Sequence, residues 1–240
     1  MANANWRGTV GMIKPTRGSG SLEELIRMLP EGIGVIPLFN NIRHGRIEEF
    51  RSAIPLYEEK IAELAGDKVD FIQAAGTPPF MLLGYRGEQE LIEKWEKRFN
   101  IPISTSGRSQ VEGMRALKIR KFVGAGYDFE DTSIVARYFT DAGFEVLALE
   151  KLPGPWEEIG KLSSREIYAQ VKKAFLKHPG AEGIYFQGGK LRILDIIEML
   201  EQDLGVPVLH PGVAQAWEIM KRLHVRQPKS GYGRLLAELP

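Results

Sequence analysis

The stretch that decides the fold is Phe71-Ile72-Gln73-Ala74-Ala75-Gly76-Thr77, and its pattern recurs in Gly183-Ile184-Tyr185-Phe186-Gln187-Gly188-Gly189. Each stretch is an apolar run that ends in glycine, and sequence with helical character follows each. An apolar run of this length bounded by glycine or proline is typical of a strand buried on both faces of a parallel sheet. Both stretches therefore predict a buried strand that leads into a helix at its carboxyl end.

The same alternation of strand and helix runs along the whole chain. Apolar residues spaced by three and four indicate helices between the strands, as in the stripe from Ile47 to Leu64, where Pro55 is expected to kink the helix or to start its second half. Strand–helix alternation at this spacing predicts βαβ units with right-handed crossovers, and thus an α/β fold. The expected strands are residues 9–13, 34–39, 69–75, 101–105, 121–125, 145–149, 183–186 and 206–210.

The two halves of the chain match in three places that occur in the same order. We interpret the matches as an internal duplication of a four-strand α/β unit. The boundary is expected near residues 117–120, which predicts a first lobe of residues 1–117 completed by 212–240 and a second lobe of residues 118–211. The matched pairs are 10–15 with 123–128, 71–77 with 183–189, and 101–103 followed by Gly107 and Gln110 with 206–208 followed by Gly212 and Gln215.

Composition narrows the class of protein. The 240 residues are 43% hydrophobic and 26% charged, with a formal net charge of +1, which provides no electrostatic field for nucleic acid or anionic membranes. No apolar run is long enough to cross a bilayer, and the first residues lack the pattern of a signal peptide. We therefore expect a cytoplasmic protein that binds neither nucleic acid nor membrane.

Two further classes of chemistry find no support in the sequence. The absence of cysteine excludes disulfides, thiolate metal sites and thiol catalysis. No pair of histidines has metal-binding spacing, and no glycine-rich dinucleotide or phosphate-binding motif occurs. We therefore expect no metal and no cofactor.

Candidate site residues follow the strands, because two facing lobes would place the carboxyl ends of their strands around one cleft, where α/β sheets bind ligands. Lys14 and Arg17 suit a substrate carboxylate, although a solvated loop explains them equally well. The next segment, Gly18-Ser19-Gly20, favours a plain connection over a flap hinge. The other candidates are Thr16, Asn40, Gly76, Thr77, Ser104, Thr105, Ser106, Tyr127, Gln187, Gly188, Lys190 and His210.

Several short motifs occur in a fixed order, namely Gly11-Met12-Ile13, Gly76-Thr77, Tyr127, Gly188-Gly189, Leu204-Gly205-Val206-Pro207-Val208 and Ser230-Gly231-Tyr232-Gly233-Arg234-Leu235-Leu236. In this order the chain resembles the aspartate/glutamate racemase superfamily, and within it the branch of arylmalonate decarboxylases and maleate cis-trans isomerases. The resemblance covers nearly the whole chain. It implies two pseudo-symmetric flavodoxin-like domains, each a four-stranded parallel sheet flanked by helices, with the active-site cleft between them. It also implies an enzyme for small carboxylic acids, and it leaves a homo-oligomer open.

In this superfamily, racemases and isomerases carry two cysteines that face each other across the cleft, and arylmalonate decarboxylase keeps only the second. The first position corresponds to Gly76. The second corresponds to Gly188 in an ungapped alignment, or to Gln187 or Gly189 after a shift of one residue. None of these residues has a nucleophilic side chain, so chemistry excludes thiol-based racemisation.

The resemblance also implies how the decarboxylase holds a carboxylate and the enediolate formed from it: with a Thr, a Ser, a Tyr and backbone N–H groups. Thr77 and Tyr127 match the Thr and the Tyr, whereas Pro78 replaces the Ser and offers neither a hydroxyl nor an N–H. Plainer explanations stay open, because Thr77-Pro78 suits a helix start, Tyr127 a buried tyrosine, and Gly188-Gly189 a tight turn.

The expected function is cofactor-free decarboxylation of a malonate-type acid, because this reaction needs anion stabilisation and a single proton donor. Lys190, His210 or a bound water would deliver the proton, unless Lys190 is a solvated residue and His210 a packed neighbour. Trp156 is expected to cover an apolar substrate group or to anchor its loop. The alternatives are a lyase, hydratase, isomerase or hydrolase with the same anion hole, and a non-catalytic carboxylate-binding protein.

Overall fold

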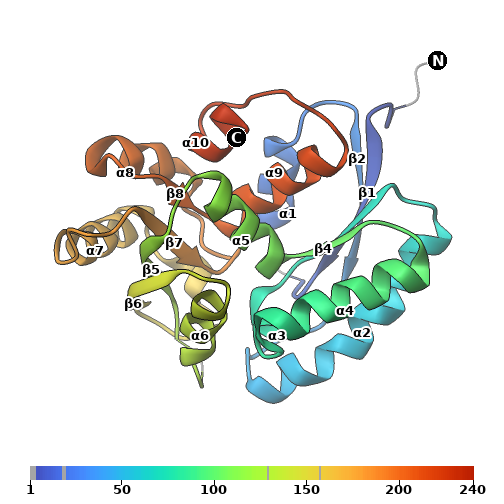
Figure 1. The fold of residues 1–240 in the computed structure, drawn as a ribbon, viewed down its shortest axis with the longest axis horizontal. Helices are drawn as coiled ribbons and strands as arrows, with labels where there is room; N and C mark the ends of the chain where they lie inside the picture. Colours follow the sequence, from blue (N-terminus) through green and yellow to red (C-terminus); the bar gives the residue numbers. More distant parts are fainter. Residues whose placement is uncertain (1–3, 18–19, 129, 157) are drawn as a thin grey trace.

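The computed structural model describes residues 4–17, 20–128, 130–156 and 158–240, so Gly18 and Ser19 lie outside the described residues. The described chain forms two parallel four-stranded sheets flanked by helices (Figure 1), which confirms the predicted fold. The first lobe contains the sheet β2-β1-β3-β4, with β1 (Gly8–Lys14), β2 (Ile33–Phe39), β3 (Phe71–Ala74) and β4 (Ile103–Thr105). The second lobe contains the sheet β6-β5-β7-β8, with β5 (Lys121–Tyr127), β6 (Glu145–Leu152), β7 (Gly183–Gln187) and β8 (Val208–Leu209).

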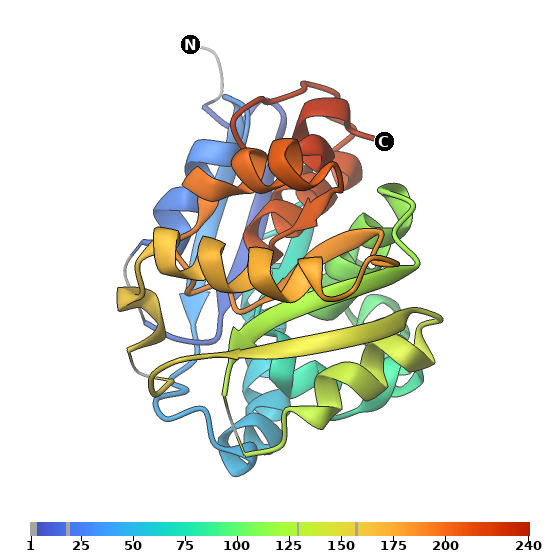
Figure 2. The ribbon, with the colours of Figure 1, turned by 90° about the vertical axis from the view of Figure 1, so that its left-hand side faces the viewer.

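The two sheets have the same strand order, which supports the interpretation of an internal duplication. In each sheet the first strand of the half lies between the second and third strands, and every neighbouring pair is parallel. Figure 2 shows the second lobe from outside, with α7 (Ser164–Leu176) and α8 (Ile197–Leu204) lying over its sheet. The carboxyl ends of the strands in both sheets lead into the loops that form the site described below.

The remaining helices complete the layers. Helix α2 runs as one element through Pro55, whose ring lies on its exposed side, so the proline starts no separate second helix. The buried side of the same helix carries Phe50, Tyr57 and Ile61, which pack against the first sheet. The bounds are α1 (Ser21–Met28), α2 (Ile47–Gly66), α3 (Thr77–Met81), α4 (Gly84–Phe99), α5 (Ser106–Ala116), α6 (Ser133–Asp141), α9 (Pro211–Arg222) and α10 (Arg234–Glu238).

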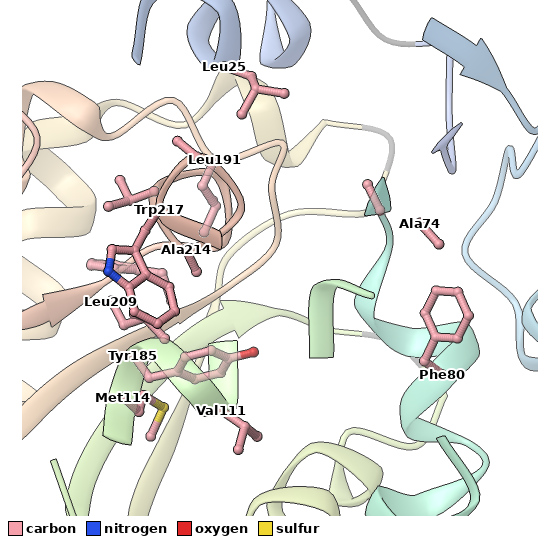
Figure 3. Close-up of a cluster of buried hydrophobic side chains, with 14 of the residues drawn as sticks. Leu25, Ala74, Phe80, Val111, Met114, Tyr185, Leu191, Leu209, Ala214 and Trp217 are labelled. Atoms are coloured by element: carbon pink, nitrogen blue, oxygen red, sulfur yellow. The ribbon is translucent and has the colours of Figure 1, made fainter. Parts of the chain in front are cut away.

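Helices α5 and α9 lie side by side between the lobes and are exchanged between them (Figure 1). Helix α9 follows β8 of the second lobe, yet it packs against α1 and β3 of the first. Helix α5 follows β4 of the first lobe and contacts β8 of the second. Side chains of both helices share one buried apolar cluster with both sheets, in which Val111, Met114, Tyr185, Leu209 and Trp217 lie close together (Figure 3).

The C-terminal segment also contacts both lobes. The N–H groups of Gly231 and Arg234 donate to Glu198 and Glu201 on α8, while the side chain of Lys229 bonds the carbonyl of Arg27 on α1. The division into residues 1–117 with 212–240 and residues 118–211 stays a prediction. In the part of the chain that the structure describes, no helix combines the length and apolar character needed to cross a membrane.

A buried carboxyl joins the lobes beside the site. Glu88 on α4 accepts a hydrogen bond of 2.6 Å from the Thr105 hydroxyl and another from the hydroxyl of Tyr138 on α6. Burial raises the pKa of Glu88 to about 7, although both hydroxyls oppose the rise. No pattern in the sequence indicated this buried group, because a glutamate on an amphipathic helix normally faces solvent.

Candidate functional site

A cavity lies between the lobes at the carboxyl ends of the strands, and it encloses about 600 Å³ when its mouth open to solvent is included. Residues from both halves of the chain line it. Most of the residues singled out in the sequence meet at this cavity, namely Lys14, Thr16, Gly76, Thr77, Pro78, Ser106, Tyr127, Trp156, Gly188, Gly189 and Lys190. The candidates that are not among the lining residues are Arg17, Asn40, Ser104, Thr105, Gln187 and His210.

The turn after β3 forms the first wall. Gly76 has a φ of +110°, a conformation that side chains rarely adopt, and a Cβ there would lie 2.7 Å from the Tyr57 hydroxyl and 2.9 Å from Pro15 Cβ. The turn is therefore built around glycine and leaves no room for a cysteine. The N–H of Gly76 donates to Ser106 Oγ over 2.9 Å, so this amide is engaged within the protein.

Thr77 is the first residue of α3, and the cap position before it is Gly76. Its hydroxyl oxygen accepts a hydrogen bond of 3.0 Å from Nε2 of Gln110, whose Oε1 accepts one of 2.7 Å from the Tyr185 hydroxyl. With the Gln110 amide in this orientation, the threonine oxygen is an acceptor within this network. The hydroxyl hydrogen of Thr77 is thereby left to point toward a ligand.

Tyr127 ends β5 and is 4% exposed. Burial raises the pKa of its hydroxyl, and a hydrogen bond with the Gln187 side chain opposes the rise. Its ring meets Trp156 edge to face, with ring centroids 4.4 Å apart. A hydroxyl in this environment stays protonated at neutral pH.

The turn after β7 contains two adjacent glycines that differ in the space around them. Gly188 has a φ of +122°, and a Cβ on it would lie 2.6 Å from Cε1 of Tyr127. A Cβ on Gly189 would meet nothing within 4 Å. Gln187 is buried and bonds the Tyr185 hydroxyl. Gln187, Gly188 and Gly189 are the three possible counterparts of the family's second cysteine. Of these three, only Gly189 both lines the cavity and has space for a longer side chain.

Two lysines bring positive charge to the cavity. Lys14 ends β1 and is only 8% exposed, and burial lowers its pKa from 10.5 to about 8 although Glu24 and Glu23 oppose the shift. The ammonium of Lys190 lies 4.3 Å from the ring centroid of Trp156, a cation–π contact. Trp156 therefore lines the cavity and packs against both Tyr127 and Lys190.

His210 caps a helix. It is the N-cap residue of α9, and its Nδ1 accepts a hydrogen bond of 3.2 Å from the N–H of Gly212. Thr105 holds the equivalent place in the first half and caps α5 through Arg108 N–H. Burial, and to a smaller extent the charge of Lys14, lowers the pKa of His210 to about 4, so the ring is neutral at pH 7.

Arg17 and Gln187, which also lie outside the lining, have different surroundings. Arg17 is exposed on the loop after β1. Gln187 lies at the end of β7, with its side chain directed to the buried Tyr185 hydroxyl. Gln187 therefore contacts the site through Tyr127 and Tyr185 rather than directly.

The structure adds two glutamines that sequence reasoning did not assign to the site. Gln110 on α5 holds Thr77, and Gln215 on α9 lines the cavity and donates from Nε2 to Ser106 Oγ over 2.8 Å. They occupy equivalent places in the repeat, each five residues after the helix cap, Thr105 or His210. The sequence did contain a signal for them, because the two halves carry glutamine at matching positions. Within the described residues, no group of three His, Cys, Asp or Glu side chains is arranged to hold a metal ion.

Comparisons with known proteins agree with this architecture. A curated relative, an arylmalonate decarboxylase from Bordetella bronchiseptica, is 24% identical over 202 residues, which are 78% of this chain and 82% of the relative. Maleate isomerase Iso from Pseudomonas putida S16 superposes with a TM-score of 0.89 at 20% identity, covering 97% of this chain and 99% of the isomerase. A crystal structure of arylmalonate decarboxylase gives a TM-score of 0.82 at 21% identity, covering 95% and 98%. The model of the arylmalonate decarboxylase family matches residues 40–236. The chain therefore belongs to the arylmalonate decarboxylase family.

Proposed function

We propose that this protein is a cofactor-free enzyme that removes one carboxylate from a small malonate-type acid, without thiol chemistry. The observation that carries the proposal is the single cavity lined by Thr77, Tyr127, Lys14 and Lys190 together. Two hydroxyl donors and two cations converge there from both lobes. Such a lining suits a dianionic acid and the enediolate formed from it.

The retained carboxylate of the substrate would accept hydrogen bonds from Thr77 and Tyr127. As the carbon–carbon bond to the leaving carboxylate breaks, carbon dioxide departs and its bonding electron pair moves into the enediolate. The negative charge on the enediolate oxygens then exceeds that on the substrate carboxylate, so the same donors bind the transition state more strongly. The Gly76 amide is engaged by Ser106, which leaves the amides of Thr77, Gly188, Gly189 and Lys190 as the proposed backbone donors.

A proton delivered to the enediolate carbon completes the reaction. Lys14 suits this step best, because it lines the cavity, is mostly protonated at pH 7 and has a pKa of about 8, near the working pH. His210 is neutral at pH 7 and caps α9. Lys190 is the second candidate donor, since it also lines the cavity.

Proton NMR of a panel of substituted malonates tests the proposal. The wild type is expected to convert at least one malonate to the monoacid, and Thr77→Val and Lys14→Met are expected to lower kcat by about 10²-fold or more, the usual effect of losing one transition-state donor. Lys94→Met, a change at an exposed lysine on α4, is the control and should leave turnover intact. Absence of turnover for every malonate would overturn the decarboxylase assignment.

A second function, the addition or removal of water on a small unsaturated acid, is favoured by one observation. Lys14 is a buried amine whose pKa is low enough for the neutral form to act as a base at mildly alkaline pH. Incorporation of oxygen from labelled water into the product, measured by mass spectrometry, would identify this reaction. Decarboxylation introduces no solvent oxygen.

A further inference from the structure

Ser106 occupies a special position in the cavity wall. It is the first residue of α5, it is 1% exposed, and it lines the cavity beside the turn at Gly76 and Thr77. Two N–H groups converge on its Oγ: the backbone N–H of Gly76 at 2.9 Å and Nε2 of Gln215 at 2.8 Å. One donor comes from the first lobe and the other from the exchanged helix α9.

The direction of these bonds decides what the hydroxyl can do. A serine hydroxyl has two acceptor lone pairs and one hydrogen. Gly76 and Gln215 occupy both lone pairs, so the hydrogen can only be donated to a third group. Among the described residues, no carbonyl or side chain is recorded as accepting this hydrogen from Ser106. Donors on the oxygen also polarise the O–H bond and strengthen it as a donor.

We propose that Ser106 donates its hydroxyl hydrogen to the substrate oxyanion and replaces the donor that Pro78 lacks. This inference rests on the proposed function, since it places Ser106 in the same anion hole as Thr77 and Tyr127. It also makes Gln215 a positioning residue, which acts on the substrate through the serine. The repeat supports this role, because Gln110 fills an acceptor position of Thr77 in the same way.

The competing explanation is structural: the serine would only tie the turn at Gly76 to α9. Gln215→Glu separates the two explanations, because a carboxylate cannot donate and would instead accept the hydrogen of Ser106. The link to α9 would survive, but the hydrogen would be withdrawn from the substrate. Gln215→Met removes the link and leaves the hydrogen available. A donor role therefore predicts a lower kcat for Gln215→Glu than for Gln215→Met, and a purely structural role predicts the reverse order.

The experiment measures kcat at saturating malonate for Ser106→Ala, for both Gln215 variants and for Ser109→Ala. The last is a matched control, because Ser109 lies on the same helix, is buried and donates to the Thr105 carbonyl away from the cavity. Ser106→Ala is expected to lower kcat by about 10²-fold, as for other oxyanion-hole donors. Ser109→Ala is expected to leave kcat unchanged.

The added charge of Gln215→Glu is controlled by combining it with Ser106→Ala. If the glutamate acts through the serine, its effect disappears in the Ser106→Ala background, whereas a direct charge effect persists there and overturns the proposal. Calorimetric titration with malonate provides a readout independent of turnover. One outcome is that the wild type binds malonate without turnover and that Ser106→Ala binds it more weakly. This outcome would reject the decarboxylase assignment and retain Ser106 as an anion donor. A wild type that neither binds nor converts malonate would overturn both.

Discussion

The edge of the Tyr127 ring fills the space where a side chain on Gly188 would stand, with only 2.6 Å between Cε1 and the position of that Cβ. The position of the Tyr127 ring therefore requires glycine at residue 188. A cysteine at this position would force the ring, and with it the donor hydroxyl, to move. The structure thus has a steric reason to keep this position free of any side chain.

We predict that Gly188→Ala destabilises the protein while Gly189→Ala does not. The first change combines a positive φ with the contact to Tyr127, which corresponds to about 1–3 kcal/mol of strain. The second places a methyl group in open space. Urea unfolding of the two variants checks the difference. Equal stabilities would show that the Tyr127 ring yields without cost.

Trp156 is predicted to set the preference for the substrate side group. Its ring lines the cavity between Tyr127 and Lys190, and it also contacts Phe50, so it offers an apolar and aromatic face. Trp156→Leu should raise KM for aryl malonates by about 10-fold, which corresponds to about 1.4 kcal/mol, and should change KM for methylmalonate much less. Steady-state kinetics with the two substrates measures the ratio. A parallel loss for both would instead indicate that the tryptophan only supports the loop.

Lys14 is predicted to lower stability while it serves activity. Its pKa is 10.5 in the unfolded chain and about 8 in the folded protein, so the unfolded chain binds more protons between these values. The free energy of unfolding of the wild type should therefore rise from pH 8 to pH 10.5, relative to Lys14→Met. At pH 7 the methionine variant should be more stable by up to about 3 kcal/mol, at about 1.4 kcal/mol for each pKa unit.

The same group should shape the pH dependence of turnover. If the ammonium of Lys14 supplies the proton, kcat falls as pH rises through about 8, because the donor loses its hydrogen. A pH–rate profile of the wild type, with chemical denaturation of both proteins at pH 7 and 10, tests the two statements. A variant that keeps full activity and gains stability would remove Lys14 from the mechanism.

Glu88 is predicted to make stability depend on pH in a different range. Its pKa is 4.5 in the unfolded chain and about 7 in the folded protein, so the folded protein binds more protons between these values. Stability should thus fall as pH rises from 4.5 to 7, by about 2–3 kcal/mol relative to Glu88→Gln. Urea unfolding of both proteins at pH 5 and pH 7.5 measures the difference. A difference that is constant with pH would show that the carboxyl titrates normally.

The fold was readable from the sequence because its strands are continuous apolar runs that end in glycine or proline. Each of the eight expected strands overlaps an observed one, and the repeat predicted two equivalent sheets. The strand ends likewise predicted which loops face the cavity. These signals are local or periodic, so they survive in a single sequence.

The direction of individual side chains was not readable in the same way. His210 follows a strand as the site residues do, but its ring turns back to cap α9. Gln110 and Gln215 lie inside helices, where polar residues normally face solvent, and reach the site only because α5 and α9 pack between the lobes. Such contacts depend on tertiary packing between distant segments, which no local pattern records.

The exchange of α5 and α9 between the lobes is what a fused, helix-exchanged dimer would show. A half-length ancestor with the same terminal helix could have covered its open face by lending that helix to a second copy of itself and borrowing one in return. Fusion of the two genes would then have joined an existing dimer into one chain. In such a chain the paired positions are free to differ, as Ser106 and Pro211 do: each begins its helix and lines the cavity, but only the serine has a hydrogen to donate.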